Sequence, residues 1–177
     1  MIKNYLIVSF LSFIVAIFFF VLYNQHIIIY MPQQKTIQSP ARAQHYKKEI
    51  TLHFFHHDKW VCEKQELLWS DSVTTNSYQL INAWLAILDE ERITTKKVTL
   101  QAALLSTDKT LYLSFDHNPL SKEETIVKKW MLCEGLLKTI RENSLAVHSV
   151  QFLVQHQPLV DYHLDFSSPW LIQGFMC

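Results

Sequence analysis

The sequence has very little glycine and no surplus of charge. Only Gly135 and Gly174 are present among 177 residues, so no glycine-rich loop is available to cradle a pyrophosphate. Sixteen Lys and Arg residues balance sixteen Asp and Glu residues, so the chain lacks the basic excess with which proteins neutralise a phosphate backbone. These absences argue against P-loop and dinucleotide-binding classes, and against a nucleic-acid partner.

Charge is also absent from residues 5–23, a largely apolar run that contains neither proline nor glycine. As a helix this run would be roughly 28 Å long, close to the hydrocarbon thickness of a bilayer. Lys3 precedes it and the next basic residue is Lys35, a bias typical of a segment whose N-terminus stays in the cytoplasm. Residues 1–30 are therefore predicted to be a single-pass anchor in the cytoplasmic (inner) membrane, with the rest of the chain extracytoplasmic or periplasmic.

A cleaved signal peptide is the alternative to an anchor. The triplet Ala41-Arg42-Ala43 has the small-x-small form of a cleavage site, but it lies far beyond the apolar run, whose length suits an anchor better. Residues 31–48 are polar, contain Pro32 and Pro40 and show no periodicity, which is typical of a linker.

The remaining residues, 49–172, are predicted to form one domain with the order β-β-α-β-β-α-β-β. Extended runs rich in β-formers cover residues 49–55, 60–69, 97–105, 110–115 and 147–155, and a last extended piece covers 163–169. Helices that fall between pairs of strands favour an α+β fold, with two helices packed on one face of a mixed or antiparallel sheet. The predicted fold class is thus an α+β domain preceded by one transmembrane helix.

Two stretches have helical periodicity. The first begins at Thr74 or Thr75 and repeats apolar residues every three or four positions as far as Leu88. The second follows residues 121–124, which have the form of a capping box with Ser121 as the N-cap, and ends at about Asn143. The apolar stripe of this second helix is formed by Ile126, Trp130, Cys133, Leu137 and Ile140.

Several of these stretches resemble the GerMN domain, a module of sporulation and spore-germination proteins. Residues 149–154 followed by residues 163–169 (HLDFSSP) are similar to the V-x-F-L-V strand and the G-H-x-D-x-S-x-P close of that family. Residues 110–115 and 50–55 resemble two further strands of the family, so the resemblance extends over residues 49–170. It implies a non-enzymatic module that acts in envelope assembly through protein or cell-wall contacts. The related ring-building folds make a homo-oligomer a further expectation.

The nine histidines suggest an alternative, a small envelope hydrolase or metal-binding enzyme. Its candidate residues are His56, His57, His163 and Asp165. Adjacent residues on a strand point to opposite faces, so His56 and His57 are more often part of a solvated turn than two ligands of one ion. His163 and Asp165 share a face of an extended segment and are interpreted as structural hydrogen-bonding groups. A third hypothesis is a passive ligand-binding domain, which a concave apolar cleft would favour.

The three cysteines lie in an oxidising compartment if the predicted topology is right. Cys133 belongs to the apolar stripe and is expected to be a buried thiol, with a Cys62–Cys133 bridge as the open alternative. Cys177 would then be the odd thiol. The five tryptophans are expected to fill the core, and the candidates for an exposed aromatic patch, as the alternative, are Trp60, Trp69 and Trp170.

The favoured hypothesis is a membrane-anchored extracytoplasmic domain that acts as a non-enzymatic interaction and envelope-assembly module. Its expected partners are the lipid bilayer, through the N-terminal helix, and a protein or cell-wall component of the envelope. No catalytic residue, cofactor or metal ligand is assigned.

Overall fold

The computed structural model of the chain describes Ile17 and residues 45–174. None of the helices in this part of the chain is long and apolar enough to cross a bilayer. The predicted anchor, apart from Ile17, and most of the predicted linker lie outside the described residues. The chain divides into the units Met1–Ala41 and Arg42–Cys177, and the second contains every element described below.

The elements follow the predicted order as far as the strand over 149–154, after which two short strands, at 157–158 and 170–171, replace the predicted last strand over 163–169. They are β1 Tyr46–His56, β2 Lys59–Trp69, α2 Val73–Glu90, β3 Leu100–Leu105, β4 Thr110–Phe115, α3 Ile126–Glu142, β5 Ser149–Val154, β6 Gln157–Pro158 and β7 Trp170–Leu171. The α+β class with two helices is therefore confirmed.

The strands form two separate sheets. In the larger one the order is β3-β4-β5-β6, with β7 paired to β5. β4 and β5 run parallel, joined by a crossover through α3, whereas the other pairs are antiparallel, so this sheet is mixed. β1 and β2 form a two-stranded antiparallel hairpin of their own. The prediction of one sheet that contains all the strands is wrong.

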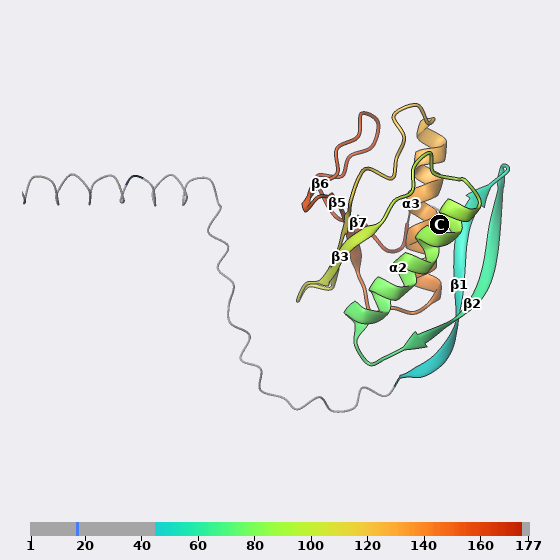
Figure 1. Cartoon of the computed structure of the whole chain (residues 1–177). Coiled ribbons are helices and arrows are strands. Elements are labelled where there is room, and N and C mark those ends of the chain that lie inside the picture. Colours follow the sequence, from blue (N-terminus) through green and yellow to red (C-terminus); the bar gives the residue numbers. More distant parts are fainter. Residues whose placement is uncertain (1–16, 18–44, 175–177) are drawn as a thin grey trace, which may run out of the picture. The chain divides into compact units, whose positions relative to one another are not determined.

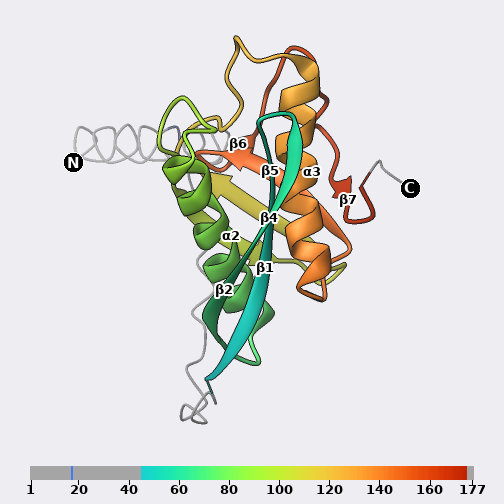
Figure 2. The ribbon, with the colours of Figure 1, turned by 90° about the vertical axis from the view of Figure 1, so that its right-hand side faces the viewer.

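The domain has three layers (Figures 1 and 2). Both helices lie on one face of the larger sheet, and the β1–β2 hairpin crosses the outer side of both helices. The helices and the sheet are tightly packed, since the void between Trp84, Leu136 and Phe152 measures only about 10 Å³. In β1 the residues Ile50, Leu52 and Phe54 are buried, and so is His53 between them. An isolated two-stranded hairpin is only marginally stable in water, so β1 depends on this packing.

The backbone of β1 is also tied to the helices by hydrogen bonds. Asn143, which follows α3, pairs with Thr51 as a neighbouring strand would: Oδ1 accepts from the Thr51 N–H at 3.0 Å and Nδ2 donates to the Thr51 carbonyl at 2.7 Å. The Thr139 hydroxyl accepts from the His53 N–H at 2.8 Å, and the indole N–H of Trp84 donates to the His53 carbonyl at 2.8 Å. Side chains of the two helices thus satisfy the edge of β1 that faces away from β2.

A glycine in the middle of α3 permits this close approach. A Cβ atom on Gly135 would lie 3.0 Å from the carbonyl oxygen of His53 and 3.4 Å from the Cα of Phe54. Glycine inside a helix costs about 1 kcal/mol relative to alanine, and the contact with β1 accounts for that cost at this position.

Three local predictions need correction. β1 begins at Tyr46 rather than Glu49, so its first three residues belong to the segment expected as linker. The N-cap of α3 is Thr125, whose hydroxyl accepts from the Lys128 N–H, and not Ser121. Residues 163–169 form turns rather than an extended strand.

Replacing Thr139 with valine should destabilise the domain by ~1–3 kcal/mol, because it leaves the buried His53 N–H without a partner while the shape of the side chain is kept. Thr139→Ser is the matched control, since it retains the hydroxyl. Urea denaturation of both variants measures the difference, and equal stability of Thr139→Val and the unmodified chain would show that this bond does not hold β1.

Candidate functional site

Loops from four parts of the chain meet at one end of the domain, where β1 ends and α3 begins (Figures 1 and 2). They are the β1–β2 turn and the segments 91–95, 116–125 and 159–163, and we call this region the distal end. β1 starts at Tyr46 and reaches the distal end at His56, so the chain enters the domain at the opposite end. Eleven residues of strand separate the two ends by about 35 Å.

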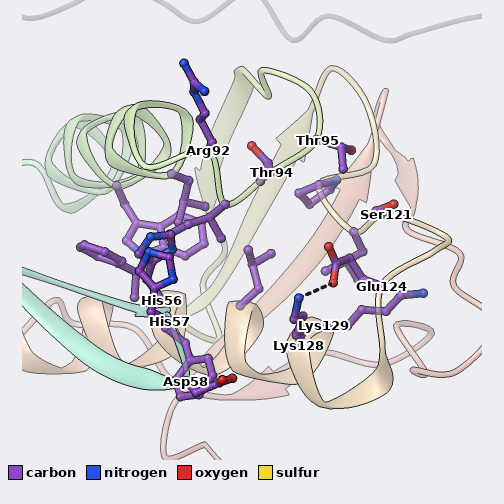
Figure 3. Close-up of a pocket in the computed structure, with 18 residues that line it drawn as sticks. His56, His57, Asp58, Arg92, Thr94, Thr95, Ser121, Glu124, Lys128 and Lys129 are labelled. Atoms are coloured by element: carbon purple, nitrogen blue, oxygen red, sulfur yellow. Dashed lines mark ion pairs between the residues drawn. The ribbon is translucent and has the colours of Figure 1, made fainter.

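The distal end contains a pocket of about 330 Å³ (Figure 3). Its lining includes apolar side chains that belong to the core, which are Phe54, Trp84, Leu88 and Leu120. Polar residues of the surrounding loops also line it, among them His56, His57, Thr94, Thr95 and Ser121. The pocket therefore combines a preformed apolar lining with polar groups from the loops, the usual composition of a binding site.

Two walls of the pocket have backbone that favours glycine but contains none. Arg92 follows the C-cap of α2 with φ of +53°, and the Ile93 N–H donates to the Leu88 carbonyl at 2.8 Å, as in a Schellman motif. The β1–β2 turn has positive φ at both His57 and Asp58, which is the type I′ geometry of a two-residue hairpin. At these three positions the chain therefore carries side chains where glycine is the usual residue.

Two of the charged groups that line the pocket, and one of its histidines, lie close to an oppositely charged group or a carboxylate of the protein. Lys128 Nζ lies 3.5 Å from Glu124 Oε2, and His56 Nε2 lies 3.6 Å from Glu91 Oε2. Figure 3 shows the imidazoles of His56 and His57 on one side of the pocket and the Glu124–Lys128 pair on the other. The centroids of the two imidazole rings are 3.8 Å apart.

Lys129 also lines the pocket, but its ammonium group is used elsewhere. Its Nζ donates to Asp161 Oδ2 at 2.6 Å, and both side chains are almost fully buried, at 1% and 2% exposed. The other oxygen of Asp161 accepts from the backbone N–H groups of His163 and Leu164. Burial, the largest influence, raises the pKa of Asp161, but the bonds from Lys129 and the backbone outweigh it and the net pKa is lowered. Asp161 therefore stays ionised and fixes segment 159–163 against α3.

The residues on either side of Asp161 are apolar and exposed. Val160 and Tyr162 are each 83% exposed, although the side chain of Asp161 between them is buried. The first turns of α3 add three further exposed apolar side chains, Ile126, Val127 and Trp130. We call these five residues the apolar cluster. Exposed apolar side chains often mark an interaction site, and the Lys129–Asp161 bond joins the two segments that carry these five.

The residues predicted for the enzymatic alternative do not come together. His56 and His57 line the pocket, whereas His163 and Asp165 are not among its lining residues. His163 Nδ1 lies 3.4 Å from Lys129 Nζ, and Asp165 accepts from the Ser167 N–H at 2.8 Å. Within the described ranges, no three His, Cys, Asp or Glu residues are placed to hold a metal ion.

The cysteines behave in part as expected. Cys133 is buried in α3, as predicted, and burial together with Asp161 and Glu134 raises the pKa of its thiol far above the ordinary value. Cys62 is exposed on β2, and both thiols are free, so the alternative bridge between them is not formed. Cys177 lies outside the described residues.

The tryptophans mostly fill the core, as expected: Trp69, Trp84 and Trp170 are buried, so the alternative of an exposed patch fails at Trp69 and Trp170. Trp60 is half-buried, whereas Trp130 is 41% exposed and belongs to the apolar cluster. Sequence reasoning placed Trp130 on the buried stripe of α3, and it missed the Lys129–Asp161 pair. A lysine at position 129 falls between Ile126 and Cys133 on that stripe, and this is the signal that indicates a buried partner.

Comparison with known proteins gives one structural neighbour to report. No family model matches the sequence, and no curated protein matches it. Among solved structures, the chain is similar to the tandem GerMN domains of the sporulation protein GerM from Bacillus subtilis, with a TM-score of 0.44 and 14% sequence identity. The match covers 78% of this chain and 49% of that one, so the chain spans about half the length of its neighbour. Membership of the GerMN family therefore stays a prediction.

Replacing Lys129 with methionine should destabilise the domain by ~3–5 kcal/mol, because it leaves the buried Asp161 carboxylate without its counter-charge. Lys128→Met is the matched control: the neighbouring lysine pairs with Glu124 at the surface, and its loss should change stability by less than about 1 kcal/mol. The double variant Lys129→Met, Asp161→Leu should recover most of the loss. Thermal or urea denaturation checks all three, and an equal effect of the two single substitutions would contradict a structural role for the buried pair.

Proposed function

We propose that this chain is a membrane-tethered, extracytoplasmic, GerMN-like binding domain that engages a protein or cell-wall component of the envelope through its distal end. The observation that carries the proposal is the pair of exposed apolar side chains, Val160 and Tyr162, held in place by the buried Asp161–Lys129 bond. A solvent-exposed loop does not require a buried ion pair in order to remain soluble. A rigid apolar surface, in contrast, lowers the entropic cost of binding a partner.

The arrangement of the domain supports a tethered role. The chain enters the domain at Tyr46, about 35 Å of strand away from the distal end. If residues 1–30 are inserted in a bilayer, the linker leads to the end of the domain that lies opposite the apolar cluster. The pocket and the cluster are then free to meet a partner that is not part of this chain.

A binding role, rather than a catalytic one, is supported by the chemistry at the distal end. The protonated, buried Cys133 is not poised as a nucleophile, and His163 is engaged beside Lys129 and Asp161. The resemblance of residues 149–154 and 163–169 to GerMN domains agrees with a non-catalytic module of the cell envelope. An assembly role in a sporulation-like process is the finer part of the proposal.

The proposed topology predicts the location of the C-terminus. An alkaline phosphatase fusion to the C-terminus, expressed in a bacterium, should be active and should sediment with the membranes, because the enzyme folds only outside the cytoplasm. The control replaces Lys3 with glutamine and inserts two lysines directly after the apolar run, which should reduce the activity. An inactive fusion, or an active one released in full to the soluble fraction, would contradict the tether.

The proposed binding surface predicts the effect of polar substitutions. Val160→Ser with Tyr162→Ser should abolish a specific crosslinked adduct of the full chain in intact membranes, while the free energy of unfolding changes by no more than about 0.5 kcal/mol per substitution. Leu104→Ser is the matched control, since Leu104 is 64% exposed on β3, outside the apolar cluster. An adduct that survives the double substitution, or that Leu104→Ser removes equally, would contradict the assignment.

A further inference from the structure

We propose that the outer edge of β2 pairs with the same edge of a second copy of this chain, in an antiparallel dimer with Gln65 on its twofold axis. The edge belongs neither to the pocket nor to the apolar cluster, so the inference goes beyond the proposed function and does not rest on it. The assigned partner is the strand Lys59–Trp69 of another molecule.

The backbone of β2 has one edge that no other strand uses. Thr51 and His53 of β1 direct their N–H and C=O groups away from β2, to Asn143 and to side chains of the helices. The residues opposite them, Lys64 and Cys62, therefore direct their own N–H and C=O groups away from β1. Among the described residues, no hydrogen bond satisfies these groups. Such an edge is a template for another strand.

The open edge is long, regular and accessible. β2 has eleven residues, about twice the usual length of a strand, and it contains neither proline nor a bulge that would end the pairing. All residues from 62 to 66 are exposed, and Leu68 is 56% exposed. A second strand can therefore approach without displacing any described part of the domain.

The hydrogen-bonding pattern limits how two copies can pair. Two antiparallel copies of β2 are related by a twofold axis, and residues at equal distances from the axis face each other. Residues with even numbers carry the free N–H and C=O groups, so they must face residues with even numbers on the second copy. The axis therefore passes through a residue and not between two residues.

The charges of β2 then select the position of the axis. With Gln65 on the axis, Lys64 faces Glu66 of the second copy, and Glu66 faces Lys64 of the second copy. An axis at Glu63, Lys64 or Glu66 would place two like charges directly opposite each other, which is destabilising. An axis at Cys62 or at Leu67 brings no opposite charges face to face.

The selected register also continues the ion pairs within the hairpin. Lys47 Nζ lies 3.1 Å from Glu66 Oε2, and Lys64 Nζ lies 2.7 Å from Glu49 Oε1. In the dimer, Lys47, Glu66, Lys64 of the second copy and Glu49 of the second copy would follow one another across four strands with alternating sign. Networks of this kind contribute more than isolated surface pairs. The complementarity of β2 with itself is the argument for a second copy as the occupant.

The segment that precedes β1 in the same chain is a less suitable occupant. It enters the domain at Tyr46, on β1, and would have to cross the end of the hairpin to reach the outer edge of β2. Pro40 lacks an N–H group and would interrupt a strand formed by this segment. The experiment below distinguishes this occupant from a second copy.

Disulfide crosslinking of the full chain tests the register. In the background Cys62→Ala with Cys177→Ala, Gln65→Cys places two thiols at the axis, where the Cα atoms lie about 4.5 Å apart and a disulfide can form. Glu63→Cys is the matched control, exposed on the same face of the same strand, but its two copies would lie ~13 Å apart along the strands. Under copper–phenanthroline oxidation, Gln65→Cys should give ~10-fold or more disulfide dimer than Glu63→Cys, because only the first pair has the required geometry.

Charge exchange tests the selection. Lys64→Glu or Glu66→Lys, each combined with Gln65→Cys, should lower the yield of dimer by ~5-fold or more, because each places like charges opposite each other at two positions. Co-expression of the two variants with different tags should restore a mixed dimer, since opposite charges then face each other again. The rescue separates pairing from misfolding, because each chain keeps its own substitution.

Several results would overturn the inference. They are equal yields from Gln65→Cys and Glu63→Cys, no dimer from either, and no mixed dimer from the two charge variants. A dimer that appears only after deletion of residues 33–41 would assign the edge to the segment before β1 instead. Loss of the Val160- and Tyr162-dependent adduct alone would reject the proposed function and leave the dimer standing, and the reverse result would reject the dimer alone.

Discussion

The fold depends on the contact between the edge of β1 and the two helices. A hairpin of two strands does not bury enough apolar surface to be stable alone, and β1 and β2 share no sheet with the other strands. Thr139 and Asn143 take the place of a third strand, and Trp84 satisfies the His53 carbonyl from α2. Because His56 and His57 line the pocket, the same bonds that hold β1 also set one wall of the candidate site. Gly135 allows the two backbones to meet closely enough for these bonds to form.

The scarcity of glycine has a structural consequence at the surface. Among the described residues, seven that are not glycine adopt positive φ, and three of them, His57, Asp58 and Arg92, line the pocket. A side chain in this conformation costs of order 1 kcal/mol relative to glycine. The comparison with Ser144 is informative, because α3 ends in the same kind of motif away from the pocket. The conformational cost of positive φ is thus spread over the molecule. At the distal end, the residues that bear this cost add side chains where glycine would leave bare backbone.

Local sequence patterns predicted most of the elements but not their assembly. The strands over 110–115 and 149–154 and the stop at Asn143 follow from β-propensity, apolar periodicity and capping preference, all of which act within a few residues. Ser121 was a reasonable N-cap by the same reasoning. It instead closes a turn, in which its carbonyl accepts from the Glu124 N–H, and the helix begins at Ile126, directly after its N-cap Thr125. The separation of β1–β2 from the larger sheet depends on contacts between residues more than 80 positions apart, such as His53 with Thr139, and no local pattern contains that information.

The misread segment after β5 shows why the candidate site was hardest to predict. The alternation of residues 163–169 suggested a strand, but the carboxylates of Asp161 and Asp165 each accept from a backbone N–H two residues later. Such bonds offer the backbone an alternative to sheet pairing, so polar alternation becomes a series of turns.

The Lys129–Asp161 bond then fixes the register of these turns against α3. Two charges are costly to bury, and apolar residues of similar volume would often stabilise a protein as well or better. An apolar pair would leave segment 159–163 free to shift along the helix, however, whereas an ammonium bonded to one carboxylate oxygen defines a single position. The exposed Val160 and Tyr162 are therefore held in one arrangement beside α3. The buried ion pair therefore gives segment 159–163 a defined position beside α3.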